Sequence, residues 1–204
     1  MIALIDYGAG NLRSVQNALE RLDVRYRIVT APPDLDGVQG IIFPGVGAAA
    51  PAMAALQDRQ LEEPIKSSIR HGMPFLGICL GLEVLFERSA EDGAICLGVL
   101  EGTVERLKTA EKLPHIGWNS LERVRPHPVL RETEGKAFYF VHSYVVVPRD
   151  PGVIAAETTY GVPFTSVVDR DHLVGVQFHP ERSGQLGLRL LDNFVRFARV
   201  AEAA

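Results

Sequence analysis

The chain has 204 residues, of which 47% are hydrophobic and 23% are charged, a composition typical of a folded globular protein. Its net charge of −4 and its lack of any Lys/Arg block exclude a general nucleic-acid binder. No apolar run approaches the ~20 residues of a membrane span, and Asp6 comes too early for a secretory signal. We therefore expect no membrane contact and a cytoplasmic location, where a reactive thiol survives.

The chain has two cysteines, Cys79 and Cys96. Neither Cys79 nor Cys96 has a C-x-x-C partner, so a disulfide framework or a zinc site is not expected. We expect no metal and no cofactor. Nothing ionisable closely flanks Cys96, which indicates a packing residue.

The first 29 residues predict a β-α-β unit and hence a parallel sheet. Residues 2–5 are a short apolar strand, residues 6–11 (DYGAGN) turn out of it, and residues 24–29 form a second strand. Asn11 is a plausible N-cap for the helix between them. That helix has an apolar face made of Leu12, Val15, Leu19 and Leu22.

A glycine pair in the first turn invites a dinucleotide-binding interpretation. Gly8 and Gly10 match the start of G-x-G-x-x-G, but position 13 is Arg. Without the third glycine, a tight turn is the favoured interpretation.

A second glycine-rich turn follows the apolar strand at residues 40–44. Its residues 45–47 (GVG) can turn backbone amides toward an anion or oxyanion. The alternative is a flexible loop that opens the Ala-rich helix at residues 48–57. Another helical pattern covers residues 61–70.

The most distinctive stretch is GICLG at residues 77–81. An apolar strand at residues 73–78 precedes it and a helix-like run follows, so Cys79 lies at a nucleophile elbow. The start of that helix should favour the thiolate, and the Leu80 amide is placed to donate to an oxyanion. The alternative is a small buried cysteine in a strand-turn-helix packing site.

The second half of the chain is rich in short β-type runs. Those between residues 103 and 168 predict a twisted antiparallel extension of the sheet, because no Ser/Gly-rich linker precedes them. Residues 173–178 form another strand, and residues 184–201 form the closing helix. We expect a single domain over residues 1–204.

A cysteine nucleophile needs a base, and His179 is the strongest candidate among the six histidines. Glu181 follows it across a proline, at a spacing that lets a carboxylate orient the ring. Taken alone, His-Pro-Glu is a weak signal, and an ordinary loop is the favoured interpretation. The carboxyl ends of parallel strands share one edge, so Cys79, residues 45–47 and His179 can meet there.

These motifs resemble those of the class I, or triad-type, glutamine amidotransferases. The class is carried by GICLG, PGVG (44–47) and QFHPE (177–181). A subfamily, the glutaminase subunits of imidazole glycerol phosphate synthases, is suggested by DYGAGN (6–11), PHIGWN (114–119) and YFVHSY (139–144). The resemblance covers essentially the whole chain. It implies a flavodoxin-like α/β fold, with a mostly parallel central sheet flanked by helices and an antiparallel extension.

The resemblance implies a glutaminase mechanism with L-glutamine as substrate. Cys79 would attack the side-chain amide, while His179, oriented by Glu181, would protonate the departing ammonia. Water would then hydrolyse the γ-glutamyl thioester. Leu80 and one amide of Gly45, Val46 or Gly47 would hold the oxyanion, in a loop thought to reorient when the partner is loaded.

The resemblance also implies a heterodimer with a (β/α)8-barrel cyclase subunit in histidine biosynthesis. Ammonia would pass through the barrel, which makes imidazole glycerol phosphate and an aminoimidazole carboxamide ribotide. Asn11, Trp118 and Arg182 are the expected interface residues. The family usually has Lys where Arg182 stands, so the charge is kept and the geometry differs.

The substrate-binding pattern departs from the family at one position. The family places Gln four residues after the nucleophile, whereas this chain has Glu83, which cannot donate a hydrogen bond unless protonated. A carboxylate there would favour the substrate ammonium and repel its carboxylate. Glu91 matches the acid that holds the substrate amino group, and Ser143 and Tyr144 match main-chain contacts.

Two other classes of function remain compatible with the sequence, a silent subunit and a different enzyme. A silent interaction subunit would keep the fold without turnover, but the intact Cys79, His179 and Glu181 argue against it. A glutaminase for another synthase, or a stand-alone γ-glutamyl hydrolase, would keep these residues with less reason to carry PHIGWN and DYGAGN.

Overall fold

The computed structural model describes residues 1–8 and 11–202. Its helices are α1 (Leu12–Arg21), α2 (Ala49–Asp58), α3 (Glu62–Arg70), α4 (Leu80–Glu83) and α5 (Gly184–Glu202). Short 3-10 turns lie at η1 (Pro32–Leu35), η2 (Pro128–Leu130), η3 (Pro151–Val153) and η4 (Pro180–Arg182). None of these described helices is long and apolar enough to cross a lipid bilayer.

Most of the described strands belong to one sheet. They are β1 (Ile2–Ile5), β2 (Tyr26–Val29), β3 (Gly40–Gly45), β4 (Phe75–Cys79), β5 (Arg88–Ser89), β6 (Gly102–Arg106), β9 (Tyr144–Pro148), β10 (Ile154–Tyr160), β11 (Val162–Arg170) and β12 (Leu173–Val176). Their order is β2-β1-β3-β4-β12-β11-β9-β6-β5, with β10 paired to β11. A second, two-stranded sheet joins β7 (His115–Ser120) to β8 (Ala137–His142).

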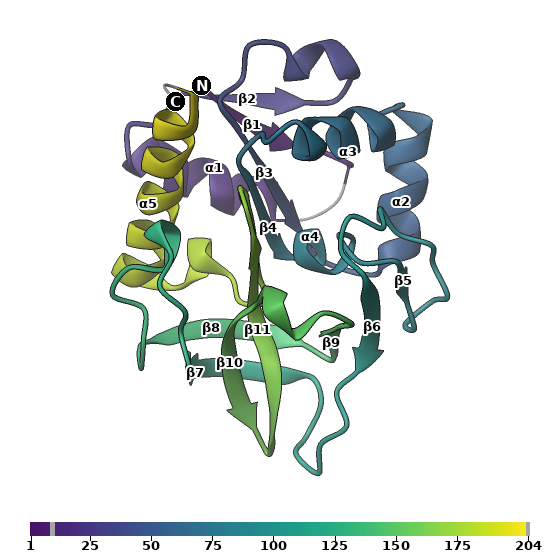
Figure 1. The fold of residues 1–204 in the computed structure, drawn as a ribbon, viewed down its shortest axis with the longest axis vertical. Coiled ribbons are helices and arrows are strands. Elements are labelled where there is room, and N and C mark those ends of the chain that lie inside the picture. Colours follow the sequence, from purple (N-terminus) through teal and green to yellow (C-terminus); the bar gives the residue numbers. More distant parts are fainter. Residues whose placement is uncertain (9–10, 203–204) are drawn as a thin grey trace.

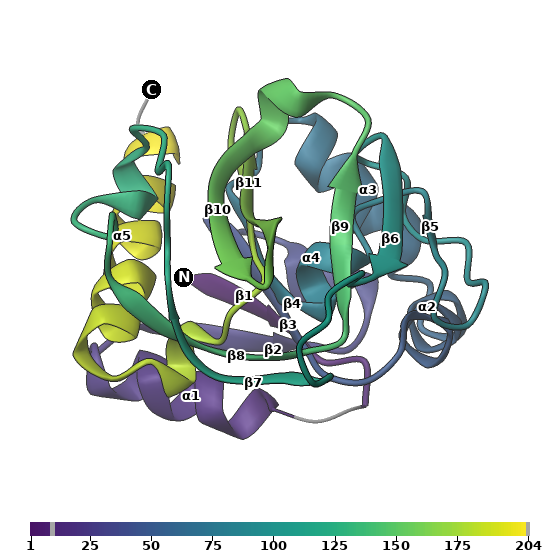
Figure 2. The same ribbon diagram turned by 90° about the horizontal axis from the view of Figure 1, so that it is seen from below.

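The strands β2-β1-β3-β4-β12 pair in parallel and form the centre of the fold. Helices cover both faces, with α1 and α5 on one side and α2 and α3 on the other (Figures 1 and 2). The expected flavodoxin-like α/β architecture with a mostly parallel sheet is therefore confirmed.

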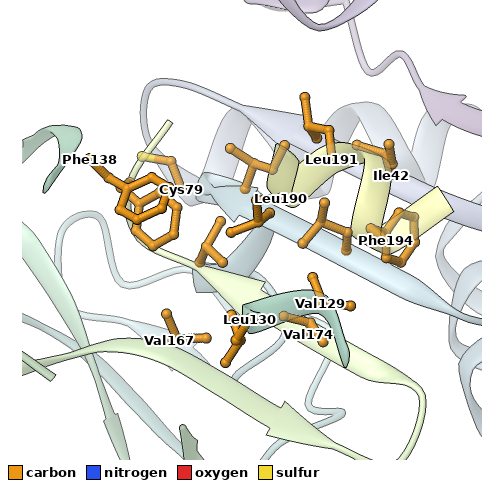
Figure 3. Packing of buried hydrophobic residues seen from close by; sticks show 14 of the residues in the cluster. Ile42, Cys79, Val129, Leu130, Phe138, Val167, Val174, Leu190, Leu191 and Phe194 are labelled. Atoms are coloured by element: carbon orange, nitrogen blue, oxygen red, sulfur yellow. The ribbon is translucent and has the colours of Figure 1, made fainter. Parts of the chain in front are cut away.

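The alternation of side chains along the strands divides the core between the two faces. In β1, Ile2 and Leu4 pack in the cluster with α1 and α5, whereas Ala3 and Ile5 pack in the cluster with α2 and α3. Cys79 belongs to the first cluster. Figure 3 shows it beside Phe138 at the end of the cluster opposite Phe194.

The predicted antiparallel extension is confirmed for β11, β9 and β6. The expectation that all later strands join the same sheet is wrong for β7 and β8. The β-type run through residues 137–148 changes partner at Ser143, because β8 pairs with β7 while β9 pairs with β6. The sequence favours a strand on both sides of Ser143, so it does not reveal this change of partner.

Two local expectations need correction. The helix after Cys79 is a single turn, because the carbonyls of Val84, Leu85 and Phe86 accept hydrogen bonds from the segment 97–100. Asn11 precedes α1 in a left-handed conformation (φ 42°), but its side chain does not cap the helix. The turn that contains Ala9 and Gly10, on which the choice between a tight turn and a cofactor loop depends, lies outside the described residues.

Candidate active site

Strand pairing brings the three predicted motifs to one edge of the sheet. Gly45 at the end of β3 lies opposite Cys79 at the end of β4. On the other side of β4, Val176 pairs with Ile78, so Gln177 and His179 continue past the end of β12 beside Cys79. This is the carboxyl edge of the parallel strands, where α/β proteins bind their ligands.

The backbone at Cys79 has the strained geometry of an elbow. Its φ of 53° and ψ of −108° lie outside the regions that L-residues readily adopt. The turn closes because both flanking glycines lack a side chain. A Cβ at Gly77 would lie 2.4 Å from the Gly81 carbonyl oxygen, and one at Gly81 would lie 1.9 Å from that of Phe43. The G-x-C-x-G spacing is therefore a steric requirement of this turn.

His179 and Glu181 form a buried pair. The distance between His179 Nδ1 and Glu181 Oε1 is 2.8 Å, and the two side chains are 1% and 0% exposed. With Nδ1–H donating to the carboxylate, Nε2 is left as the basic nitrogen. His179 Nε2 is buried and has no hydrogen-bond partner among the described residues. It is therefore available to a thiol or a substrate.

Asn11 contributes to this pair from the start of α1. Its side-chain Nδ2 donates to Glu181 Oε1 and lies 3.3 Å from His179 Nδ1. The sequence suggested Asn11 as a helix cap and an interface residue. The cap is wrong, because the side-chain amide holds the carboxylate that orients the imidazole, whereas the interface role stays a prediction.

The main chain of His179 is fixed by strand β8. Its backbone N–H donates to the Tyr139 carbonyl at 2.8 Å, and its carbonyl accepts from Ser183 Oγ at 2.6 Å. Ser183 Oγ also accepts from the Tyr139 N–H at 3.0 Å. This link explains how the small β7-β8 sheet positions the candidate base.

The expectation that Cys79 is a thiolate is wrong in the resting structure. Burial raises the pKa of the Cys79 thiol well above its usual value, and the carboxyls of Glu83 and Glu181 add to this effect. A hydrogen bond from the Leu80 amide lowers the pKa but does not outweigh desolvation. The one-turn helix α4 adds little dipole stabilisation. The cysteine therefore rests as a thiol and needs a base.

Glu83 and Gln177 form a second buried pair behind the cysteine. Gln177 Nε2 donates to Glu83 Oε1 at 3.1 Å and lies 3.9 Å from Cys79 Sγ. Burial is the main cause that raises the pKa of Glu83 to about 8, and Glu91 and Asp92 raise it further. At neutral pH Glu83 is therefore a protonated acid, with both a donor and an acceptor as an amide has.

The other predicted substrate residues are Glu91, Ser143 and Tyr144. Glu91 is exposed on the loop that follows β5. The Ser143 carbonyl accepts from the Leu107 N–H at 2.9 Å, and the Tyr144 carbonyl lies 2.9 Å from His142 Nδ1. Each carbonyl oxygen has a second lone pair, so both can still accept a hydrogen bond from a ligand.

Two buried histidines, His115 and His142, lie next to the Tyr144 carbonyl. His115 Nδ1 lies 3.0 Å from His142 Nε2, and burial lowers the pKa of His142 to about 3. Both rings are therefore neutral and serve as hydrogen-bonding links between β7, β8 and the Tyr144 carbonyl.

The predicted oxyanion loop, residues 45–47, is hydrogen-bonded to Tyr7. The Val46 N–H donates to the Tyr7 hydroxyl at 3.1 Å, and that hydroxyl lies 3.2 Å from the Val46 carbonyl. Gly45 is buried opposite Cys79, whereas Gly47 is exposed with a φ of 92°. The loop thus lies beside the cysteine with its central amide already bonded.

Two of the predicted interface residues, Trp118 and Arg182, lie at the surface on either side of Tyr139. Trp118 is 59% exposed and packs edge-on against Tyr139, with ring centroids 6.2 Å apart. The Arg182 guanidinium lies 4.4 Å from the centroid of the Tyr139 ring. Ile116, on the same strand as Trp118, is 60% exposed. These residues extend from the surface to the backbone that carries His179.

The sequence alone predicts no role for Tyr7 or Gln177. Tyr7 lies in the motif DYGAGN and Gln177 in QFHPE, so the sequence does carry a signal for both. Their roles depend on contacts with Val46 and Glu83, which are 39 and 94 positions away along the chain.

Comparisons with known proteins agree on the family. The model of the family "Glutamine amidotransferase class-I" matches residues 3–197. A relative from Dehalococcoides mccartyi, named imidazole glycerol phosphate synthase subunit HisH, is 46% identical over 97% of this chain and 98% of its own. One with the same name from Desulfitobacterium hafniense is 48% identical over 95% and 93%.

Solved structures show the same fold at lower identity. A structure described as a glutamine amidotransferase has a TM-score of 0.75 at 21% identity, covering 98% of this chain and all of the other. PurLQS from Thermotoga maritima has a TM-score of 0.77 at 19% identity, covering 96% and 97%. The family match and the full-length relatives together show that this chain is a glutamine-hydrolysing enzyme that belongs to the class I glutamine amidotransferases.

Proposed function

We propose that this chain is the glutaminase subunit of an imidazole glycerol phosphate synthase. The observation that carries the proposal is the buried His179–Glu181 pair at the same sheet edge as the strained Cys79. The full-length relatives named HisH support the choice of synthase.

The first half of the reaction forms a thioester. Cys79 Sγ attacks the side-chain carbonyl carbon of glutamine as His179 Nε2 takes the thiol proton. His179 then gives that proton to the departing nitrogen, the C–N bond breaks and ammonia leaves. Glu181 stabilises the imidazolium that forms in between. The raised pKa of the Cys79 thiol makes this proton transfer necessary.

The second half regenerates the enzyme. His179 removes a proton from water, which attacks the thioester carbon, and the proton returns to the sulfur as the C–S bond breaks. The net reaction converts glutamine and water into glutamate and ammonia. No redox partner or metal enters this balance.

The oxyanion of each tetrahedral intermediate needs two donors. The Leu80 amide already donates to Cys79 and lies at the start of α4. Val46 in the loop at residues 45–47 supplies the second amide after it leaves Tyr7. The residues expected to bind the glutamine backbone are Glu83, Glu91, Ser143 and Tyr144, and Gln177 joins them through its hydrogen bond to Glu83.

The partner in this proposal is a (β/α)8-barrel cyclase subunit, in a cytoplasmic heterodimer through which ammonia passes. The exposed Ile116 and Trp118, with Arg182 over Tyr139, provide an apolar and cationic docking face. Asn11 links the same region to Glu181. The cyclase carries the later lyase chemistry, which yields imidazole glycerol phosphate and the ribotide.

The test is glutamate release with and without the cyclase subunit and its nucleotide substrate. We expect little activity from the isolated chain and a large stimulation in the complex. High activity in isolation would instead favour a stand-alone γ-glutamyl hydrolase. Stimulation by a different synthase subunit, and not by the cyclase, would identify another pathway.

A further inference from the structure

Tyr7 follows β1 and is only 5% exposed. Its ring packs against Phe43 in β3, with centroids 5.6 Å apart, which places its hydroxyl at the end of that strand. The hydroxyl reaches the loop at residues 45–47. Tyr7 therefore joins the turn after β1 to the turn after β3.

A single hydroxyl satisfies both polar groups of Val46. It accepts from the Val46 N–H at 3.1 Å and donates to the Val46 carbonyl at 3.2 Å. These two groups belong to successive peptide units, so the contact restrains the orientation of both. Burial is the main cause that raises the pKa of Tyr7 to about 12, so the phenol keeps the proton that it donates.

This contact is incompatible with oxyanion binding by the same amide. The Val46 N–H points at Tyr7 and cannot also align with a substrate oxygen above Cys79. Cys79 is itself only 7% exposed in this arrangement. The resting loop is therefore held in a position that leaves the oxyanion one donor short.

We propose that the Tyr7 hydroxyl is a latch that holds the Val46 peptide groups in an inactive orientation, and that its release is a step in activation. Tyr7 is thus a positioning residue that suppresses turnover in the isolated chain. The proposal rests on the proposed glutaminase function and adds the side chain that keeps that activity low.

The decisive variant is Tyr7→Phe, which keeps the ring packing against Phe43 and removes only the hydroxyl. The latch predicts that kcat of the isolated chain rises about tenfold, because two hydrogen bonds of ordinary strength no longer oppose the active orientation. KM should change little, and the rate in the complex should stay the same. The matched control is Tyr26→Phe, whose hydroxyl bonds Glu20 on the exposed surface at 2.8 Å and should have no effect.

A second readout separates the latch from a general loss of packing. Hydrogen exchange at the Val46 amide should be slow in the wild-type chain and about tenfold faster in Tyr7→Phe. The amides of the central strand β4 should exchange at unchanged rates in the variant. This measurement requires no turnover.

The outcomes distinguish the latch from the underlying function. If the wild-type complex hydrolyses glutamine but Tyr7→Phe leaves the isolated rate unchanged or lowers it, the latch is wrong and the glutaminase function stands. If the wild-type complex does not hydrolyse glutamine, the function fails, and unaltered exchange at Val46 would then also overturn the latch. If Tyr7→Phe does not fold, rapid exchange at Val46 in the wild-type chain, as in an exposed loop, overturns the proposal.

Discussion

Replacing Glu83 by Gln should stabilise the protein, by an amount that grows with pH. The carboxyl is buried and its pKa rises from an ordinary 4.5 to about 8 in the folded chain. Between these values the unfolded chain loses the proton and the folded chain retains it. The contribution of Glu83 to the free energy of unfolding therefore falls as pH rises from 4.5 to 8, at a rate of about 1.4 kcal/mol per pH unit.

The Glu83→Gln substitution removes this loss of stability, because the glutamine side chain has no carboxyl proton to release and has a nearly identical shape. Its side-chain oxygen can still accept from Gln177 Nε2, as Glu83 does at 3.1 Å. The advantage of Glu83→Gln should be close to zero at pH 4.5. It should reach about 3 kcal/mol at pH 7 and a plateau of about 5 kcal/mol above pH 8.

Urea unfolding of both proteins from pH 5 to pH 8.5 measures this difference. Glu111→Gln is the matched control, since the same atoms change on an exposed side chain and the pH dependence should remain that of the wild type. A Glu83→Gln advantage that is constant with pH, or a loss of stability at pH 7, would refute the protonated state of Glu83.

Three further substitutions test separate parts of the site. Glu181→Gln should lower kcat about 10²–10⁴-fold in the complex with less effect on KM, because the imidazolium loses its carboxylate; an unchanged kcat would contradict this role. Gly81→Ala should destabilise the fold by about 3 kcal/mol in thermal or urea unfolding, because its Cβ would overlap the Phe43 carbonyl, and wild-type stability would refute the steric argument. Cys96→Ala should leave glutamate release nearly intact, and its loss would mean that the second thiol takes part.

The backbone of the fold was predictable because its signals are local. Apolar runs and glycine turns located β1, β3 and β4, and the spacing Gly77–Cys79–Gly81 located the elbow. The length of α4 was not predictable in this way. Leu82, Leu85 and Phe86 keep helical spacing, but carbonyls at 84–86 bond with a distant segment at 97–100.

The residues of the candidate triad were also predictable, but their electrostatic state was not. The motif places Cys79 at a helix start, which argues for a thiolate, whereas burial depends on packing from the whole chain. The same is true of Tyr7 and Gln177. Their chemistry depends on which distant group they contact, and neither contact leaves a periodic signal in the sequence.

The most direct test of the central claim is Cys79→Ser in the complex with the cyclase subunit, measured with glutamine and with ammonium salts as alternative nitrogen sources. We predict that synthesis from glutamine is abolished while synthesis from ammonia proceeds at the wild-type rate. Continued use of glutamine would contradict the assignment of Cys79 as the nucleophile. Loss of both activities would contradict the division of labour between the two subunits.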